Sequence, residues 1–157
     1  MKLLLLTVGK TDSQHLEFLV AEFSKRLNRY VPFELRAVPD IKKKGNRDAA
    51  SIQEEESREV LKYIHPSDTV LLLDEKGKEF SSRNFAAYLQ KCMNSGPKRL
   101  VLVIGGAYGH GTSLRHRAFA SISLSKMTFN HQVVRLMAVE QLYRAFSILK
   151  GDPYHND

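Results

Sequence analysis

Four glycines within one short loop offer the chain's clearest ligand chemistry. Gly105, Gly106, Gly109 and Gly111 follow an apolar run that ends at Ile104. Glycine lets the backbone approach a ligand closely and adopt positive φ angles. The loop lacks the Gly-Lys-Ser/Thr ending of a P-loop, and its spacing differs from the dinucleotide-binding pattern, so we do not expect a phosphate cradle. The loop predicts either a ligand held by backbone groups or a sharp turn between crowded neighbours.

A second set of reactive side chains lies near the C-terminus. Glu140 and Arg144 are spaced i,i+4 in a predicted helix, where they can form a simple surface salt bridge or part of a site. The tail after Gly151 adds Tyr154 and His155, a ring and an imidazole suited to proton transfer. A frayed end is the ordinary alternative for a C-terminus.

The remaining reactive residues indicate no metal or acyl-transfer chemistry. His110, His116, His131 and His155 contain no pair at the i,i+4 spacing of a helical metal site. The single cysteine, Cys92, excludes an internal disulfide and a four-cysteine site, and we expect it to be a buried structural thiol. There is no Gly-x-Ser-x-Gly elbow to support a serine hydrolase.

Charge points to an anionic partner. The 157 residues include 24 Lys and Arg against 17 Asp and Glu, a net charge of +7. This balance favours nucleic acid, although an ordinary basic protein has it too. No apolar run reaches membrane-spanning length, so we expect a cytoplasmic protein that does not enter a membrane. The basic residues form three clusters: Lys25, Arg26 and Arg29; Lys42, Lys43, Lys44 and Arg47; and Arg115, His116 and Arg117.

Hydrophobic patterns predict alternating strands and helices in one domain, residues 1–157. We expect an α/β protein with a mostly parallel sheet and helices on both faces. The charged residues 74–78 are predicted to form a turn, and Glu54, Glu55 and Glu56 a solvated helix face. Predicted strands are 2–8, 33–38, 69–73, 99–104 and 122–125; predicted helices run from a cap among Thr11, Asp12 and Ser13 to Leu27, over 48–64, from Ser81 or Ser82 to Asn94, from Thr112 or Ser113 to Ala120, and over 132–150.

Two consequences follow from this arrangement. Ligand sites of parallel sheets lie at the carboxyl ends of the strands, so the loops after Leu73, Ile104 and Leu124 should form the site. The predicted helix 132–150 is apolar around nearly its whole circumference, which indicates burial on all sides. We therefore expect a second subunit to cover one side of that helix, and a charge at Val139 or Phe146 to yield monomers or unfolded chain.

Four motifs in order, spanning the whole chain, resemble one enzyme family: Val103-Ile104-Gly105-Gly106, then Leu124-Ser125-Lys126-Met127-Thr128-Phe129-x-His131, then Val139-Glu140-Gln141-Leu142-Tyr143-Arg144-Ala145, and finally Pro153-Tyr154-His155. The chain is similar to the large-subunit rRNA pseudouridine N3-methyltransferases, which belong to the SPOUT class. It departs from them at Asn130, where proline is common, and at His110, in a variable loop where we expect only rim contacts.

The resemblance implies an S-adenosylmethionine-dependent methyltransferase with a C-terminal trefoil knot, acting as a homodimer on 23S rRNA in the assembled ribosome. It implies no metal. By motif, the cofactor contacts are Leu73, Gly105, Leu124, Ser125, Lys126, Met127, Thr128 and Phe129, with Leu73, Ile104, Leu124 and Met127 forming an apolar slot for adenine.

Methyl transfer to a base nitrogen requires alignment of the acceptor and loss of the N3 proton. Glu140 and His155, and after them His131, are candidates to accept that proton. Arg144, Tyr154 and Arg135 are candidates to orient the base, and the tail is expected to act across the dimer. Two other functions stay open: a SPOUT methyltransferase acting on tRNA, and a non-catalytic ribosome-binding or RNA-binding protein of the same fold.

Overall fold

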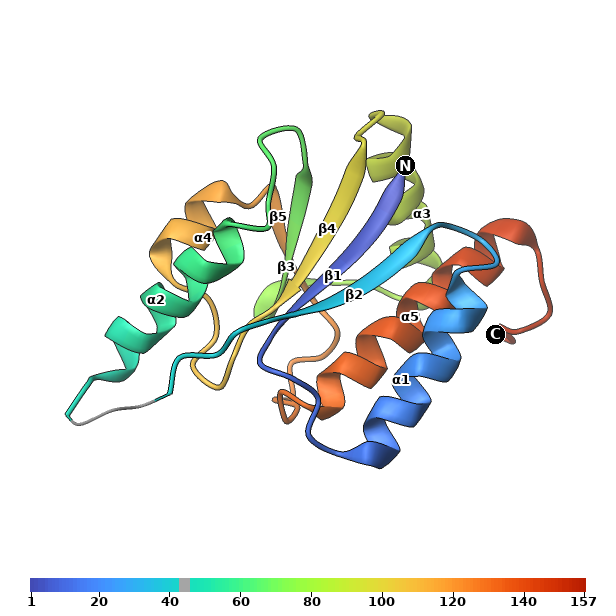
Figure 1. Ribbon diagram of the computed structural model, residues 1–157. Helices are drawn as coiled ribbons and strands as arrows, with labels where there is room; N and C mark the ends of the chain where they lie inside the picture. The colour runs from blue at the N-terminus through green and yellow to red at the C-terminus, as the bar shows by residue number, and fades with distance from the viewer. Residues whose placement is uncertain (43–45) are drawn as a thin grey trace.

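The chain folds around one five-stranded sheet (Figure 1). The computed structural model describes residues 1–42 and 46–157. All strand pairs are parallel, in the order β2-β1-β4-β3-β5. The elements are β1 (Lys2–Val8), α1 (Gln14–Leu27), β2 (Phe33–Val38), α2 (Ala49–Leu61), β3 (Thr69–Glu79), α3 (Ser82–Asn94), β4 (Arg99–Ile104), α4 (Thr112–Arg117), β5 (Ala120–Ser123) and α5 (Val133–Lys150).

Helices cover both faces of this sheet, as Figure 1 shows. Successive strand residues point to opposite faces. Leu3 and Leu5 of β1 face a core shared with α1, α3 and α5, whereas Leu4 and Leu6 face a smaller core shared with α2 and α4. A parallel sheet buries both faces in this way, which explains why the strands are continuously apolar. The predicted α/β class is confirmed.

β3 runs well past its predicted end at Leu73. Residues 74–78, which we expected to form a charged turn, belong to this strand, so that prediction is wrong. β3 pairs with Ile122 of β5 twice, at Leu73 and again at Lys78, with an irregularity between the two pairs. A Cβ at Gly77 would lie 2.6 Å from the backbone N and C of Ile122. The two segments therefore meet in a backbone contact that only glycine permits.

Other boundaries differ slightly from the sequence prediction. β5 begins at Ala120, two residues early, because Phe119 N–H already donates to Val70 O (2.8 Å). α4 ends at Arg117, and neither Thr112 nor Ser113 caps it. Its Ser113 N–H donates instead to a carboxylate of α2 (3.3 Å), which takes the place of a cap. The other helix starts are as expected, with Ser13, Asp48 and Ser81 as the capping side chains. Cys92, within α3, is buried as predicted.

α5 lies between α1 and α3, against the sheet. Its Val139 and Phe146 are buried in the core of the single chain. This packing accounts for much of the helix's apolar surface, and a charge at either residue would disrupt the core of one subunit rather than report on a dimer. Among the described residues, no helix is long and apolar enough to span a membrane.

Candidate active site

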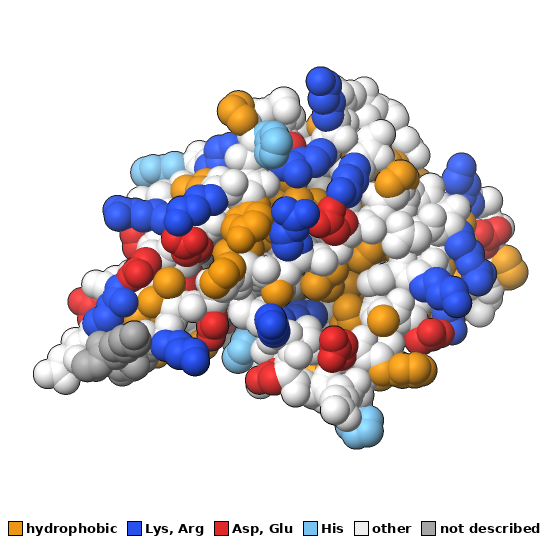
Figure 2. All heavy atoms as spheres, viewed as in Figure 1, with side chains coloured by type: hydrophobic (Ala, Val, Ile, Leu, Met, Phe, Trp, Pro, Cys, Tyr) orange, Lys and Arg blue, Asp and Glu red, His pale blue; other side chains and the backbone are white. Residues whose placement is uncertain are grey.

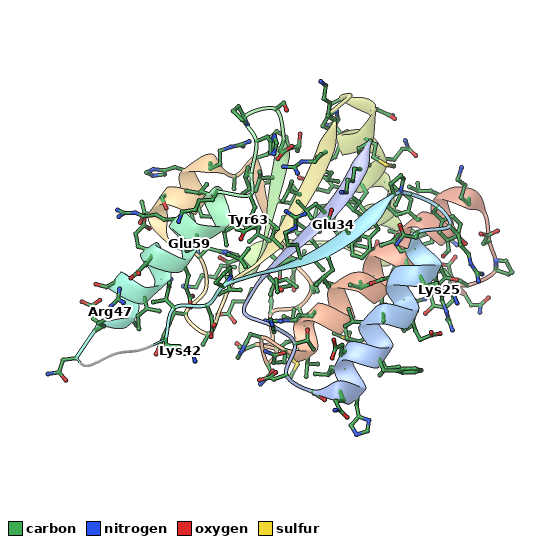
Figure 3. The ribbon with its side chains drawn as sticks, viewed as in Figure 1. Lys25, Glu34, Lys42, Arg47, Glu59 and Tyr63 are labelled. Carbon is green, nitrogen blue, oxygen red and sulfur yellow. The ribbon has the colours of Figure 1, made fainter. Side chains whose placement is uncertain are left out.

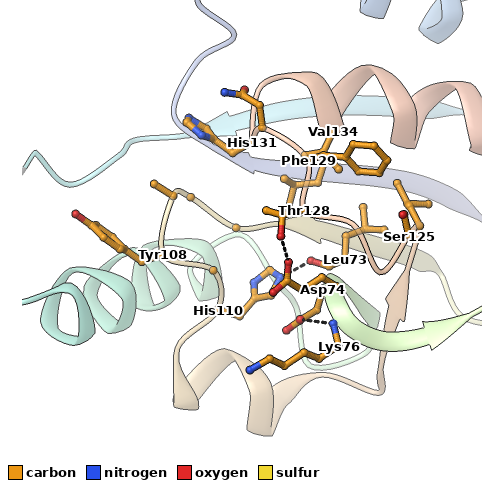
Figure 4. Close-up of a pocket in the computed structure, with 18 of the residues that line it drawn as sticks. Leu73, Asp74, Lys76, Tyr108, His110, Ser125, Thr128, Phe129, His131 and Val134 are labelled. Carbon is orange, nitrogen blue, oxygen red and sulfur yellow. Dashed lines mark hydrogen bonds between the residues drawn. The ribbon is translucent and has the colours of Figure 1, made fainter.

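A cavity of about 540 Å³ lies at the carboxyl end of the sheet (Figure 4). Its volume is within the range of about 300–1,000 Å³ for small-molecule sites. Two of the three predicted loops line it, those after β4 and β5, and the third predicted loop is replaced by residues 73–76 within β3. Lys126 does not line it; this side chain is 85% exposed, with its Nζ 3.7 Å from a Glu79 carboxylate oxygen. The predicted residues that do line it are Leu73, Ile104, Gly105, Leu124, Ser125, Met127, Thr128, Phe129 and His131.

One face of α2 holds the glycine loop in place. Gln53 Nε2 donates to Tyr108 O (2.6 Å), and Ser57 Oγ accepts from Gly111 N–H (2.7 Å). A Cβ at Gly105 would lie 2.9 Å from the carbonyl of Gly109, so the loop folds tightly on itself. The loop therefore turns sharply, as one of the two alternatives predicted, and its backbone lines the cavity.

Glu56 on the same helix is buried, which corrects the expectation of a solvated Glu54–Glu56 face. Its Oε2 would lie 2.6 Å from a Cβ at Gly106, and this oxygen has no hydrogen-bond partner among the described residues. Burial raises the pKa of this carboxyl, and the nearby Asp40 adds to that rise. The i,i+4 spacing of Gln53 and Ser57 was the only sequence signal for this helix face.

The middle of β3, residues 73–76, is tied to the glycine loop and to α4. His110 Nε2 lies 2.8 Å from Leu73 O, and Arg115 Nε donates to His110 O (3.1 Å). Arg115 also pairs with Asp74 (2.6 Å). Burial alone would raise the pKa of Asp74, but Lys76 N–H and Arg115 outweigh it and hold that pKa below its usual value. Sequence reasoning missed Asp74 and Arg115 because it placed them in a turn and in a basic surface cluster.

The third loop, residues 124–131, is fixed by short-range hydrogen bonds. Met127 N–H donates to Ser125 Oγ (3.0 Å), and Thr128 Oγ1 donates to Glu75 (2.5 Å) across the cavity mouth. Asn130, the departure from the family's proline, accepts from Gln132 N–H (2.8 Å) and so supplies a turn of its own. Met127 is 77% exposed and lies at the rim of the cavity.

Arg135 anchors this loop and is fully buried. Its guanidinium donates to Val8 O (2.7 Å), Gly9 O (2.9 Å) and His131 O (3.1 Å). Burial lowers its pKa from the ordinary arginine value. The expectation that Arg135 orients a target base is therefore wrong, because its donors are already used by the end of β1 and the start of α5.

The four predicted catalytic residues form a second cluster on α5 and the tail. Glu140 Oε1 accepts from Arg144 (2.7 Å) and from Tyr154 OH (2.9 Å), and Arg144 Nη1 lies 3.2 Å from His155 Nδ1. The Arg144 guanidinium lies 4.7 Å from the centre of the Tyr154 ring. Burial, and then the bond to Glu140, raise the pKa of Tyr154. The predicted Glu140–Arg144 pair is present and is less exposed than a surface salt bridge.

The tail is anchored rather than frayed. Gly151 closes α5 at φ 75°, and Asp152 N–H donates back to Ser147 O (2.9 Å), a common helix stop. Tyr30 OH donates to Asp152, and this bond, with burial, raises the pKa of Tyr30 to about 12. Arg83 of α3 holds Asp157.

Cavity and tail cluster lie apart within one chain. None of Glu140, Arg144, Tyr154 and His155 lines the cavity. Val134, at the start of α5, does line it, and Arg144 follows ten residues later, about 15 Å along the helix axis. The chain's own tail therefore does not complete its own cavity in this structure.

Comparison with known proteins decides the family. Residues 1–155 match a family model described as "Predicted SPOUT methyltransferase". The chain belongs to the SPOUT methyltransferase family. It is 51% identical over 156 residues to ribosomal RNA large subunit methyltransferase H of Christiangramia forsetii, with 99% of each chain covered. It is 47% identical over 157 residues to the protein of that name from Parabacteroides distasonis, with 100% of each covered.

The SPOUT methyl donor is S-adenosylmethionine, and the cavity fits this molecule. Leu73, Ile104 and Leu124 give an apolar wall suited to a purine ring, as predicted. Gly105 lines the cavity, and the loop needs glycine there because a Cβ would lie 2.9 Å from the Gly109 carbonyl. Asp74 and Glu75 line the same cavity, where Asp74 is paired with Arg115, and their carboxylates would favour a sulfonium or ammonium group. Among the described residues, no group of three His, Cys, Asp or Glu side chains forms a metal site.

Proposed function

We propose that this SPOUT chain transfers the methyl group of S-adenosylmethionine to N3 of a pseudouridine in 23S rRNA of the assembled ribosome, in the cytoplasm. The cavity formed by residues 73–76 of β3 and by the loops after β4 and β5 carries the proposal, since its wall suits the methyl donor. The names of the full-length relatives support large-subunit rRNA as the substrate. We also propose one SPOUT domain, residues 1–157, with the trefoil knot of the class; the close passage of Ile122 over Gly77 supports such a threaded path.

The chemistry assigns different tasks to the tail residues. Bound S-adenosylmethionine supplies an electrophilic methyl group. Glu140 accepts hydrogen bonds from Arg144, Tyr154 and Gln141, so both of its oxygens are occupied and it positions its neighbours. Arg144 neutralises the charge that spreads over the base oxygens when N3 loses its proton, and the Tyr154 ring stacked on it orients the base. His155 and His131 are the remaining candidates to accept the proton. Nδ1 of His155 lies 3.2 Å from Arg144 Nη1, so His155 accepts a proton only after it releases this arginine.

The active form is a homodimer in which the tail of one subunit completes the cavity of the other. In a two-fold dimer both chains use the same surface, so that if residue i of one chain contacts residue j of its mate, j of the first chain also contacts i of the mate. The cavity lies at the start of α5 and the tail cluster along its second half, so antiparallel α5 helices would bring each tail to the partner's cavity. Phe18 and Leu19 on α1 and Val133 on α5 remain exposed, and such apolar surface marks an interface.

The basic residues support binding to a large RNA surface rather than to one compact patch. In Figure 3, Lys25 on α1 and Lys42 before α2 lie at opposite ends of the view, and Figure 2 shows acidic side chains among the basic ones. Arg115 and Arg117 are engaged with Asp74 and with backbone carbonyls, so the third cluster is largely structural. Lys43 and Lys44 lie outside the described residues. Ribosome affinity should fall with added salt as counterions are released.

A methyl-transfer assay with four substrates tests the function. Labelled S-adenosylmethionine is incubated with the protein and with 70S ribosomes, 50S subunits, protein-free 23S rRNA or tRNA, each from cells lacking this modification. We expect N3-methylpseudouridine, identified by mass spectrometry of nucleosides, in 23S rRNA from ribosomal particles. Methylated tRNA would favour the alternative SPOUT substrate. Salt-sensitive ribosome binding without binding of S-adenosylmethionine would favour the non-catalytic protein.

A further inference from the structure

His110 lies deeper in the cavity than its place in a variable loop suggested. It is only 3% exposed, which corrects the expectation of rim contacts. Figure 4 shows its imidazole beside Leu73 and Asp74 of β3. Nε2 lies 2.8 Å from Leu73 O, and because a carbonyl oxygen can only accept, Nε2 carries the proton. Burial lowers the pKa of His110, so the ring is neutral and Nδ1 has a free lone pair.

That Nδ1 is buried and has no hydrogen-bond partner among the described residues. The charged groups around His110 are already engaged. Asp74 on β3 accepts from Lys76 N–H (2.9 Å) and pairs with Arg115 of α4. Glu54 on α2 accepts from Ser113 N–H (3.3 Å). The protein thus leaves Nδ1 of His110 as a buried acceptor without a partner in the cavity, next to charged groups that are already paired.

We propose that Nδ1 of His110 accepts a hydrogen bond from an N–H or O–H donor on the nucleoside of bound S-adenosylmethionine. This inference rests on the proposed function. An adenosine carries such donors at its 6-amino group and its ribose hydroxyls, and a buried acceptor left unpaired is costly, so filling it favours binding. No residue assigned by motif supplies this contact.

The proposal makes cofactor affinity depend on pH in a defined direction. Protonation would turn Nδ1 into a donor and remove the lone pair that the nucleoside needs. It would also place a positive charge in the cavity, beside the sulfonium of S-adenosylmethionine. Affinity should therefore fall as pH drops through the folded-state pKa of His110, which lies below the ordinary value of about 6.5. S-Adenosylhomocysteine is uncharged at sulfur and should lose less affinity.

Calorimetry with S-adenosylhomocysteine tests the contact directly. His110→Gln places an amide donor towards Leu73 O but removes the acceptor at Nδ1, and should weaken binding about tenfold. His110→Asn places an oxygen near the Nδ1 position and should retain more affinity than the glutamine variant. His116→Gln, the same change on the exposed side of α4, is the matched control and should bind like wild type. Thermal melting establishes that each variant is folded.

Two further measurements make the outcome decisive. The ¹⁵N resonances of His110 should report an Nε2–H tautomer in the free protein, with the Nδ1 signal shifting on binding without protonation. Binding of S-inosylhomocysteine and of 2′- and 3′-deoxy analogues is then compared between wild type and His110→Gln. Removal of one of these donors should lower the affinity of wild type and leave the affinity of the variant unchanged. The inference is overturned if wild type and His110→Gln bind equally, or if removal of each donor lowers the affinity of both proteins to the same extent. Either result leaves the proposed function intact. Failure of wild type to bind S-adenosylhomocysteine at all would instead refute the proposed function.

Discussion

Replacing Gly105 by alanine should weaken cofactor binding while leaving the fold intact. The added Cβ would lie 2.9 Å from the carbonyl of Gly109, whereas ordinary contacts begin at 3.4 Å, so the shortfall is 3.4 − 2.9 = 0.5 Å. The obstructing atoms are backbone, and they belong to the tight turn closed by Gly109 N–H and Gly106 O (3.1 Å). Such overpacking costs about 1–3 kcal/mol. A domain stable by about 5–15 kcal/mol survives this loss.

The effect on affinity follows from the same strain. The free protein can relieve the strain by moving the loop, but the ligand requires the original loop position, so binding must restore the strain. Each 1.4 kcal/mol corresponds to about a tenfold change in affinity, and we expect Gly105→Ala to bind S-adenosylhomocysteine about 5–150-fold more weakly. Calorimetry measures the affinity, and chemical denaturation measures the stability.

Gly96→Ala provides the matched control. Gly96 has φ +76°, so alanine is strained there, but a Cβ meets no atom within 4 Å and the residue does not line the cavity. It should lose about 1 kcal/mol of stability and no affinity. If Gly105→Ala binds as tightly as this control, Gly105 does not shape the cofactor site and the reasoning fails.

Three further substitutions test the supports of the site. Gly77→Ala brings a Cβ to 2.6 Å from the Ile122 backbone and should cost more than about 3 kcal/mol in chemical denaturation; a loss below about 1 kcal/mol would contradict the close crossing of β3 and β5. Arg135→Met leaves the carbonyls of Val8 and Gly9 without their donor and should lower the free energy of unfolding by about 3–5 kcal/mol. An unchanged free energy of unfolding would show that the buried guanidinium is dispensable. Glu56→Gln should raise the free energy of unfolding at neutral pH, because a carboxyl with a raised folded-state pKa contributes stability only at low pH and loses it as pH rises through that pKa. Its advantage over wild type should disappear below about pH 4, near the unfolded pKa of glutamate, and a pH-independent difference would refute the assignment.

Much of this architecture is readable from local sequence. The apolar runs of β1 and β4 predict buried parallel strands, and Ser13 and Ser81 cap the helices that follow a strand or turn. The three segments that line the cavity could be located because the carboxyl ends of parallel strands meet at one edge of the sheet, although the first of them is a strand rather than a loop.

What the sequence could not provide depends on tertiary contact. The charged residues 74–79 lie in a strand because β5 crosses them at Gly77, and no local pattern indicates that crossing. Arg135 and Glu56 look like surface charges, yet one is buried by backbone carbonyls and the other by the glycine loop. The separation of the tail from its own cavity depends on how α5 packs between α1 and α3, and helical periodicity says nothing of where the helix ends point.

A mixing experiment tests the composite site most directly. One chain lacks residues 154–157, and the other carries Gly105→Val, which blocks its cavity. Each alone should be inactive in methyl transfer. After subunit exchange, a mixed dimer contains one open cavity facing one intact tail only if the tail crosses to the partner, and we then expect up to about half the activity of wild-type dimers in that population. No recovered activity, despite exchange demonstrated by native mass spectrometry, would contradict a site completed by the partner's tail.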